Sequence, residues 1–297
     1  MNVLISGASG LVGSALIPAL VARGDRVIRL VRHPAEPAGP EIEWHPGSRL
    51  DPEALEGLEA VIHLAGENIF GRWTAAKKKA ICDSRVGGAQ TLSDAIAGCQ
   101  RAPRIFLSAS AIGYYGSRAD ESLDEESSSG EGFLAEVGRD WESATAAARR
   151  AGARVVNLRF GVVLSREGGA LKKMLPPFRL GLGGRIGSGK QWLSWISIDD
   201  AIGAVLFALD EERVRGPLNL VAPAPVTNVD FAKTLARVLH RPAIFPVPLL
   251  IPRLVFGREM TAETFSASQR VIPAKLVATG YNFRHPELEG ALHALLG

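Results

Sequence analysis

The stretch Gly7-Ala8-Ser9-Gly10-Leu11-Val12-Gly13 decides the fold of this chain. An apolar run precedes it and an amphipathic segment follows it, so a strand, a glycine turn and a helix stand in the order of a dinucleotide site. Gly7 allows the tight turn, Gly10 lets the backbone approach a pyrophosphate, and Gly13 lets the helix pack close to the sheet. The alternative interpretation is an ordinary glycine turn that holds no ligand.

The first turn of the predicted helix has backbone N–H groups without a partner inside the helix, and such groups favour an anion. The phosphates of a dinucleotide are therefore expected at this turn. The residues predicted to contact the cofactor here are Gly7, Ser9, Gly10, Leu11 and Val12.

A second strand is predicted at residues 26–31, and Arg32 follows it directly. A site for NAD usually has an acidic residue at that place, about 20 residues past the glycines, which binds the ribose 2′-hydroxyl. A carboxylate would repel a 2′-phosphate, whereas a guanidinium can bind it with two charge-assisted hydrogen bonds. Arg32 therefore favours NADP(H) as the cofactor; the alternative is a solvated arginine at a strand end.

The composition excludes several classes of protein. The 297 residues are 46% hydrophobic, enough for one large α/β domain or a domain with a lobe, and the net charge of +3 is too small to argue for nucleic acid. No apolar stretch reaches the roughly 20 residues that span a bilayer, so no membrane association is expected. Cys82, Cys99 and the six histidines show no metal-ligand spacing, and a reducing cytoplasm is the expected location.

Apolar runs alternate with helical patterns along the first half of the chain. Strands are predicted at residues 42–44, 60–66, 104–108 and 155–158, and helices at 133–151 and at 74–97, which Gly87-Gly88 can break. This alternation predicts an α/β fold with a Rossmann-type, doubly wound parallel sheet. We expect a cofactor-binding domain at 1–160 and a small C-terminal substrate lobe at 161–297, with sheet strands drawn from either part.

Three patterns resemble functional sites without completing one. Residues 184–190 have nearly the spacing of a Walker loop, but Gln191 stands where the Mg²⁺-binding Ser or Thr belongs. Asp199-Asp200 precede a helical pattern and are interpreted as helix N-caps rather than as a metal pair. Glu125-Glu126 lie among serines and are interpreted as a solvated turn.

Further motifs accompany the glycine turn along the chain. They are His63-Leu64-Ala65-Gly66-Glu67-Asn68-Ile69, Arg72-Trp73, Ser84-Arg85, Ser108-Ala109-Ser110-Ala111-Ile112-Gly113-Tyr114-Tyr115-Gly116, Phe133-Leu134-Ala135-Glu136, Trp195-Ile196-Ser197-Ile198-Asp199-Asp200, Ser268-Gln269-Arg270-Val271-Ile272-Pro273 and Gly280-Tyr281. Together they resemble the extended short-chain dehydrogenase/reductase superfamily over essentially the whole chain. Within it, the chain resembles the NAD-dependent epimerase/dehydratase-like "epimerase family proteins", also labelled cell-division-inhibitor-like.

The resemblance implies a nicotinamide cofactor bound at the strand ends. Carried over by position, the residues implied to line the cofactor are Leu64, Ala65, Gly66, Arg85 and Val162. Ser110 matches the superfamily's catalytic serine, which would hydrogen-bond the substrate oxygen. For Arg85 the alternative is an ion pair on a helix surface, with Asp83 or a neighbour.

The chain departs from the superfamily at the proton donor. The superfamily pattern is YxxxK, in which the lysine lowers the pKa of the tyrosine so that the phenol transfers a proton near neutral pH. The matching positions hold Phe133 and Val137, so neither group is present. Tyr114 and Tyr115 follow Ser110 near a predicted strand end, and Tyr115 is the favoured substitute; the alternative is that both pack on a turn.

The sequence therefore predicts an NADP(H)-dependent oxidoreductase or epimerase-like enzyme that acts on a small carbonyl or hydroxyl substrate. The competing hypothesis is a nucleotide-sensing binding protein that keeps the cofactor fold without catalysis, and the missing Tyr–Lys pair is its main support. The sequence names neither the substrate nor the oligomeric state.

Overall fold

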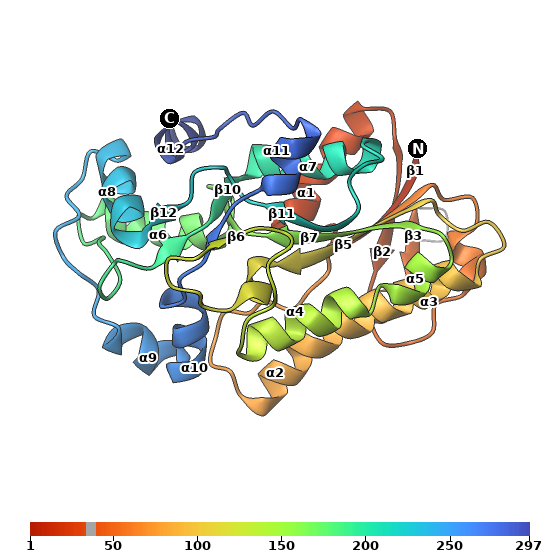
Figure 1. Ribbon diagram of the computed structural model, residues 1–297, viewed down its shortest axis with the longest axis horizontal. Coiled ribbons are helices and arrows are strands. Elements are labelled where there is room, and N and C mark those ends of the chain that lie inside the picture. The colour runs from red at the N-terminus through yellow and green to blue at the C-terminus, as the bar shows by residue number, and fades with distance from the viewer. Residues whose placement is uncertain (34–39) are drawn as a thin grey trace.

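The structure is a computed structural model that describes residues 1–33 and 40–297. Within these ranges a seven-stranded sheet forms the centre, in the order β11-β7-β5-β4-β1-β2-β3, with all neighbouring strands parallel (Figure 1). Its strands are β1 (Asn2–Ser6), β2 (Arg26–Val31), β3 (Glu41–Glu43), β4 (Ala60–His63), β5 (Ile105–Ala111), β7 (Arg154–Phe160) and β11 (Gly216–Leu220). The strand order reverses between β1 and β4, so the predicted doubly wound Rossmann-type fold is confirmed.

Helices connect these strands, and two of the predicted helices are each divided. The helices are α1 (Leu11–Ala22), α2 (Ala75–Cys82), α3 (Gly88–Gly98), α4 (Phe133–Ser143), α5 (Ala146–Arg150), α6 (Gly169–Arg179), α7 (Ile198–Asp210), α8 (Asn228–Val238), α9 (Leu250–Phe256), α10 (Arg258–Met260), α11 (Ala274–Thr279) and α12 (Leu288–Leu296). A π-helical turn at Asp83–Gly87 separates α2 from α3, and such turns are frequent at functional sites. The predicted helix at 133–151 forms α4 and α5.

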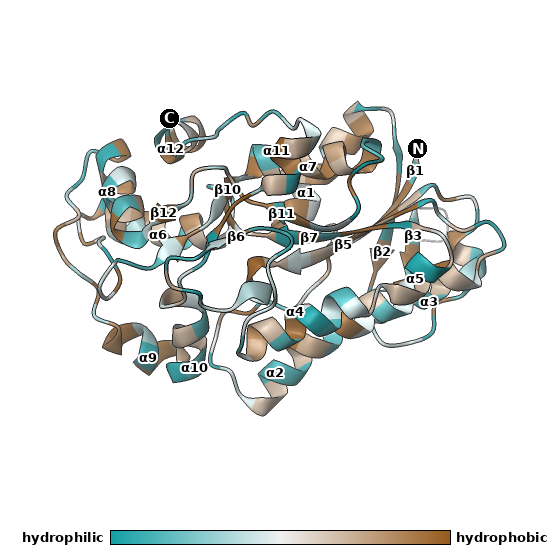
Figure 2. Cartoon of the chain, viewed as in Figure 1, coloured by the Kyte–Doolittle hydropathy of each residue, from teal (hydrophilic) through white to brown (hydrophobic). Residues whose placement is uncertain are grey.

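Both faces of the sheet are buried, because its central strands are apolar on both sides. Val3 and Ile5 lie in one hydrophobic cluster with residues of α1 and α7, whereas Leu4 between them lies in a second cluster with residues of α3 and α5. Figure 1 shows α1, α7 and α11 on one side of the sheet and α3, α4 and α5 on the other. Figure 2 shows hydrophobic colouring along much of the central strands and on α1.

After β7 the chain builds a lobe beside the sheet, at the left of Figure 1. Its core joins apolar residues of α6, α8 and α12, among them Phe178, Phe231, Leu235 and Leu292. Short strands connect it to the sheet region: β6 (Ser122–Leu123), β8 (Val162–Leu164), β9 (Trp192–Leu193), β10 (Trp195–Ser197), β12 (Val226–Thr227) and β13 (Arg270–Val271). Because β11 returns from this part of the chain, the sheet takes strands from both sides of residue 160.

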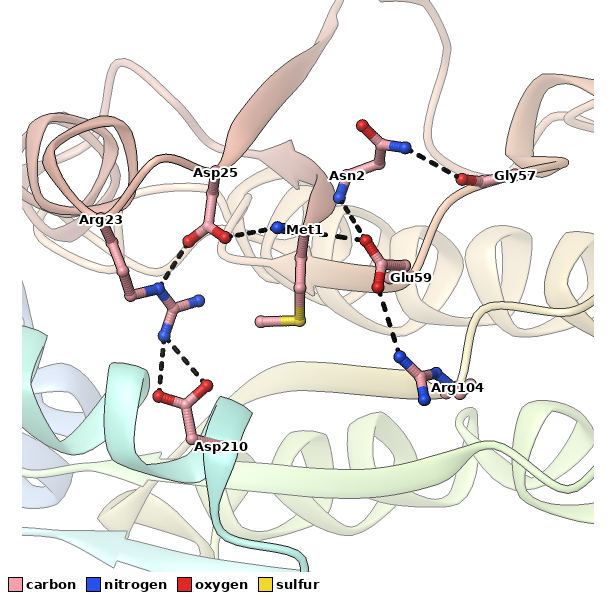
Figure 3. Close-up of polar contacts among 8 residues, drawn as sticks. All are labelled: Met1, Asn2, Arg23, Asp25, Gly57, Glu59, Arg104 and Asp210. Atoms are coloured by element: carbon pink, nitrogen blue, oxygen red, sulfur yellow. Dashed lines mark hydrogen bonds and ion pairs between the residues drawn. The ribbon is translucent and has the colours of Figure 1, made fainter.

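A network of charges fixes the amino ends of the strands (Figure 3). The N-terminal amine of Met1 pairs with Asp25 at 2.7 Å, and Arg23 pairs with the same carboxylate at 2.6 Å. Burial alone would raise the pKa of Asp25, but the hydrogen bonds from the amine and from Arg23 lower it overall. Glu59 accepts hydrogen bonds from the first backbone N–H of β1, at 2.9 Å, and from Arg104, at 3.2 Å. This end of the sheet is therefore held together by its own side chains.

Two findings concern features considered in the sequence, membrane-spanning segments and the two cysteines. Along residues 1–33 and 40–297, no helix combines the length and the apolar character that crossing a membrane requires. Cys82 and Cys99 are both free thiols and both half-buried.

Candidate functional site

The turn between β1 and α1 is too tight for side chains at two of its three glycines. Gly7 has a φ of +73°, and a Cβ there would stand 2.6 Å from the backbone carbonyl carbon of Leu64. A Cβ at Gly13 would stand 2.2 Å from the carbonyl oxygen of Gly7. The geometry matches the two roles predicted for these glycines, the tight turn and the close packing of the helix.

Gly10 differs, because the protein leaves space beside it. Its φ of −75° suits any residue, and a Cβ there would meet only the Gly7 carbonyl oxygen, at 3.2 Å. Gly10 is the N-cap of α1, where no side chain caps the helix and no acidic residue lies in the first turn. An exposed helix start with free N–H groups fits a pyrophosphate, and the predicted contacts Ser9, Leu11 and Val12 belong to the same turn.

The end of β4 lies beside this turn and is fixed by a buried histidine. His63 Nδ1 and Ser6 Oγ are 2.7 Å apart, and Ser6 Oγ also accepts a hydrogen bond from the Ala65 backbone at 3.4 Å. Desolvation lowers the pKa of His63 to about 4, so its imidazole is neutral at pH 7. The predicted cofactor-lining backbone of Leu64, Ala65 and Gly66 is thereby held next to the glycine turn.

Arg32 stands at the end of β2 and is exposed. Arg32 acts on Glu67, in the loop after β4. A 2.5 Å hydrogen bond from Lys77 is the main cause that lowers the pKa of Glu67, and the positive charges of Arg32 and Arg85 lower it further. Arg32 therefore lies at the same edge of the sheet as the ends of β1 and β4, the edge at which open α/β sheets bind ligands.

Arg85 turns inward from the π-helical turn between α2 and α3. Its Nη1 donates to the Glu67 carbonyl oxygen at 2.9 Å, and its guanidinium lies 3.4–3.6 Å from where a Cβ on Gly66 would stand. The guanidinium also lies over the Trp141 ring, 5.2 Å from its centroid. Desolvation lowers the pKa of Arg85 to about 10, so it stays charged at pH 7. The alternative pairing with Asp83 is not formed, because Asp83 pairs with a lysine of α2.

A cavity of about 410 Å³ lies at the carboxyl ends of the strands. Its walls come from the ends of β5 and β7, from α4 and α6, from the lobe and from the C-terminal segment at 263–269. Three predicted cofactor residues, Leu11, Arg85 and Val162, line it together with lobe residues such as Gln191 and Trp192. The cavity therefore leads from the glycine turn into the lobe.

The face of α4 toward this cavity carries no group that ionises near neutral pH. Leu134, Val137, Gly138 and Trp141 line the cavity at the spacing of one helix face. Phe133, at the position matching the superfamily's tyrosine, packs edge-to-face against Trp73 with ring centroids 5.1 Å apart. The absence of a Tyr–Lys pair in the sequence thus corresponds to an apolar helix face in the structure.

Ser110 belongs to a buried polar network that does not line the cavity. Its Oγ donates to Glu142 Oε1 at 2.7 Å. Arg159 binds both oxygens of the same carboxylate, at 2.7 and 2.8 Å, and donates to the Tyr115 hydroxyl at 2.8 Å. Burial would lower the pKa of Arg159, but its hydrogen bonds to Glu142 outweigh this and raise it.

The position of Tyr115 argues against the predicted role as proton donor. Its side chain is fully buried, and its hydroxyl lies 2.7 Å from Asn219 Oδ1 and 2.8 Å from the Asp124 carbonyl oxygen. Desolvation raises the pKa of Tyr115 to about 12. The phenol is therefore held by internal partners, as the packing alternative expected, and Tyr114 stacks over Arg159.

The sequence did not indicate Glu263, which lines the cavity. Both oxygens of its carboxylate accept backbone hydrogen bonds at the start of α4, from Phe133 at 2.9 Å and from Leu134 at 2.8 Å. Glu263 therefore caps α4 from a distant part of the chain, and the positive end of the helix favours its negative charge. Glu263 lies in a π-helical turn, Thr261–Phe265, and a lone glutamate there carries no sequence signal for this role.

Two acidic interpretations need correction. Glu125 is buried rather than solvated, because it accepts hydrogen bonds from the backbones of Asn219 and Lys275, at 3.0 and 3.2 Å. The N-cap of α7 is Ser197 rather than an aspartate, and the buried Asp200 accepts from the backbone of the C-terminal segment at 2.7 and 2.9 Å. Both carboxylates tie the C-terminal segment to the rest of the molecule. Among the described residues, no cluster of three or more His, Cys, Asp or Glu could hold a metal.

Comparisons with known proteins agree with this architecture. Residues 3–220 match the NAD dependent epimerase/dehydratase family, and residues 247–295 match a domain of unknown function, DUF1731. The epimerase family protein Mb2239 of Mycobacterium bovis is 44% identical over 292 residues, which cover 98% of this chain and 96% of that protein.

Two solved structures extend the likeness to three dimensions. The human epimerase family protein SDR39U1 (isoform 2), crystallised with NADPH, has a TM-score of 0.90 and 37% identity, covering 99% of both chains. A nucleoside-diphosphate sugar epimerase from Corynebacterium glutamicum has a TM-score of 0.83 and 38% identity, covering all of this chain and 58% of that one.

Proposed function

Because this chain belongs to the NAD dependent epimerase/dehydratase family, we propose that it binds NADP(H) and is an oxidoreductase or epimerase-like enzyme acting on a small carbonyl or hydroxyl substrate. The observation that carries the proposal is the uncapped start of α1 at the exposed Gly10, next to a cavity of about 410 Å³ that Leu11 lines. The human relative crystallised with NADPH supports the choice of nicotinamide cofactor.

The proposed cofactor site combines a phosphate cradle with a lined cavity. Gly7, Ser9, Gly10, Leu11 and Val12 would hold the pyrophosphate, and Leu64, Ala65, Gly66, Arg85 and Val162 would line the riboses and the nicotinamide. When bound, the nicotinamide supplies or accepts a hydride. The chain's own part is to orient the reacting groups and to exclude water, which the apolar face of α4 favours.

Arg32 is the proposed reason for a preference for NADP(H) over NAD(H). It is exposed at the sheet edge where the glycine turn ends, and it can bind a 2′-phosphate with charge-assisted hydrogen bonds. Arg32→Ala should weaken NADPH binding about 10- to 100-fold, corresponding to about 1.5–3 kcal/mol, and leave NADH binding little changed. Calorimetry with both cofactors measures this, with Arg26→Ala, exposed at the other end of β2, as the matched control. Equal losses for both cofactors would reject the assignment.

A specific observation favours a second candidate, a nucleotide-sensing binding protein. The hydroxyls of Ser110 and Tyr115 are engaged in a buried network, and the cavity face of α4 offers no phenol or amine. Single-turnover oxidation of bound NADPH with a panel of carbonyl compounds separates the two candidates. Turnover supports the enzyme, whereas tight NADPH binding without turnover supports the sensor.

We further propose a cytoplasmic location and a small-molecule partner. The free thiols of Cys82 and Cys99 fit a reducing compartment, and the cavity has the size of a small-molecule site.

A further inference from the structure

We propose that the substrate is a small, largely apolar molecule that presents hydrogen-bond donors, a hydroxyl or an ammonium group, and no phosphate or carboxylate. This inference rests on the proposed function and names the substrate class of the same site. It follows from the polar atoms at the lobe end of the cavity, which are mostly acceptors.

Two glutamines of the cavity wall have their amide orientation fixed by backbone carbonyls. Gln269 Nε2 donates to the carbonyl oxygens of Ile112 and Gly116, at 2.9 and 3.0 Å. Gln191 Nε2 donates to those of Ile186 and Phe265, at 3.1 and 3.0 Å. Only an amide nitrogen satisfies two carbonyls, so each side chain keeps its Oε1 as the atom left for a ligand, and that atom accepts.

Glu263 adds a third acceptor. Its carboxylate offers about four lone-pair sites, and the backbone N–H groups of Phe133 and Leu134 use two of them. A ligand hydroxyl or ammonium group can therefore donate to this carboxylate, whereas a ligand anion would be repelled by it.

Donors are scarce at the same end of the cavity. Trp192 Nε1 is used by Asp120, at 2.8 Å, and the Thr264 hydroxyl donates to the Met260 carbonyl oxygen, at 2.6 Å. Asn228 accepts through Oδ1 and keeps its amide nitrogen as a donor.

Cations are scarcer still. Among the described residues that line the cavity, the only Lys, Arg or His is Arg85, on the cofactor side and bound to the Glu67 carbonyl oxygen. An anionic substrate group at the lobe end would thus stand beside Glu263, whereas Arg270, whose guanidinium lies 4.6 Å from the centroid of the Trp192 ring, does not line the cavity; this is an unfavourable arrangement in a mostly apolar cavity. A nucleoside diphosphate, with two phosphates, would be the least suitable ligand.

The test uses the full chain with NADPH bound and four probes: benzylamine, benzyl alcohol, benzoate and UDP-glucose. The first three share one ring and differ in the polar group, so their affinities isolate its charge and donor character. We expect the amine and the alcohol to bind at least about tenfold more tightly than benzoate, and UDP-glucose to bind no better than benzoate. NADPH binding, followed by its own fluorescence in the same samples, tests the proposed function separately.

Glu263→Gln removes the charge and keeps the size of the side chain. The ratio of the benzoate Kd to the benzylamine Kd should therefore fall about tenfold. The matched control is Glu259→Gln. Glu259 lies on α10, pairs with Lys78 of α2 and does not line the cavity, so this change should leave the preference unchanged. Tighter binding of benzoate or UDP-glucose than of the amine and the alcohol would overturn the inference, and so would failure of both donors to bind the NADPH-loaded protein. These wild-type measurements decide the matter even if the Glu263 variant does not fold.

Discussion

The two halves of the proposed site, a cofactor half at the glycine turn and a substrate half at the lobe and the C-terminal segment, are built in opposite ways. On the cofactor side, the parts lie close together in the sequence: Gly7, Gly10 and Gly13 form one turn between one strand and one helix. On the substrate side, the wall is assembled from distant segments. Glu263 reaches the start of α4 across 130 positions, and Gln269 reaches Ile112 across 157.

The difference shows that local contacts determine the structure of one half and long-range contacts that of the other. A glycine turn is specified by local backbone requirements, so it forms wherever a strand precedes it and a helix follows it. The substrate wall exists only when the C-terminal segment docks, because its polar groups bind backbone atoms of the sheet domain. The two halves should therefore respond differently to substitution.

The buried pair of Arg159 and Glu142, which joins β7 to α4 beside both halves, should show the largest effect. Arg159→Leu leaves the Glu142 carboxylate buried without its partner, and we expect a loss of about 3–5 kcal/mol in the free energy of unfolding. Denaturant unfolding measures this loss. The double variant Arg159→Leu/Glu142→Leu should recover a large part of it, because the unpaired charge is then removed as well. If the single variant loses less than about 1 kcal/mol, the pair contributes no more than an exposed ion pair would.

Gly10→Val tests the cofactor half alone. A valine side chain would occupy the space proposed for the pyrophosphate, and its Cβ would contact one protein atom closely, the Gly7 carbonyl oxygen at 3.2 Å. NADPH affinity should therefore fall at least about a hundredfold, close to 3 kcal/mol, in a protein that still folds. Calorimetry measures the binding, and a thermal melt without ligand checks the fold. The control is Gly290→Val, exposed on α12 with open space around it. Normal NADPH binding by the Gly10 variant would make the turn purely structural.

The sequence predicted the fold of the proposed cofactor half well because its information is local. The strand-turn-helix order, the strands around it and the helix break near Gly87 follow from runs of neighbouring residues. The buried polar network beside the cavity was missed for the opposite reason. Glu125 looked solvated among serines, yet it binds the backbone of Asn219, 94 positions away. Tyr115 looked catalytic from its nearness to Ser110, yet the fold directs its hydroxyl into a buried network with Arg159.

His63, in the proposed cofactor half, should make the free energy of unfolding depend on pH. Its pKa is about 4 in the folded protein and about 6.5 when unfolded, so between these values the unfolded chain binds the extra proton. The stability that this histidine contributes is therefore present above about pH 6.5 and is lost as the pH falls toward 4, by about 3 kcal/mol. Denaturant unfolding across this pH range should show a smaller loss of unfolding free energy for His63→Gln than for wild type. The control is His293→Gln, because His293 is exposed. Parallel curves for wild type and His63→Gln would contradict the assignment.

The smallest effect is expected at Phe133, where the sequence pattern points to the proton donor but the side chain does not face the cavity. Phe133 contacts Trp73 and the ammonium group of Lys78, so Phe133→Leu should lose an aromatic contact of about 1 kcal/mol and leave NADPH affinity unchanged. Phe133→Tyr is the sharper variant, because it restores the phenol at the matching position. Since the ring would still pack against Trp73, we expect no gain in single-turnover hydride transfer. A clear gain would show that position 133 can reach the reacting atoms, and the substrate half would then be closer to the superfamily's arrangement than its apolar α4 face indicates.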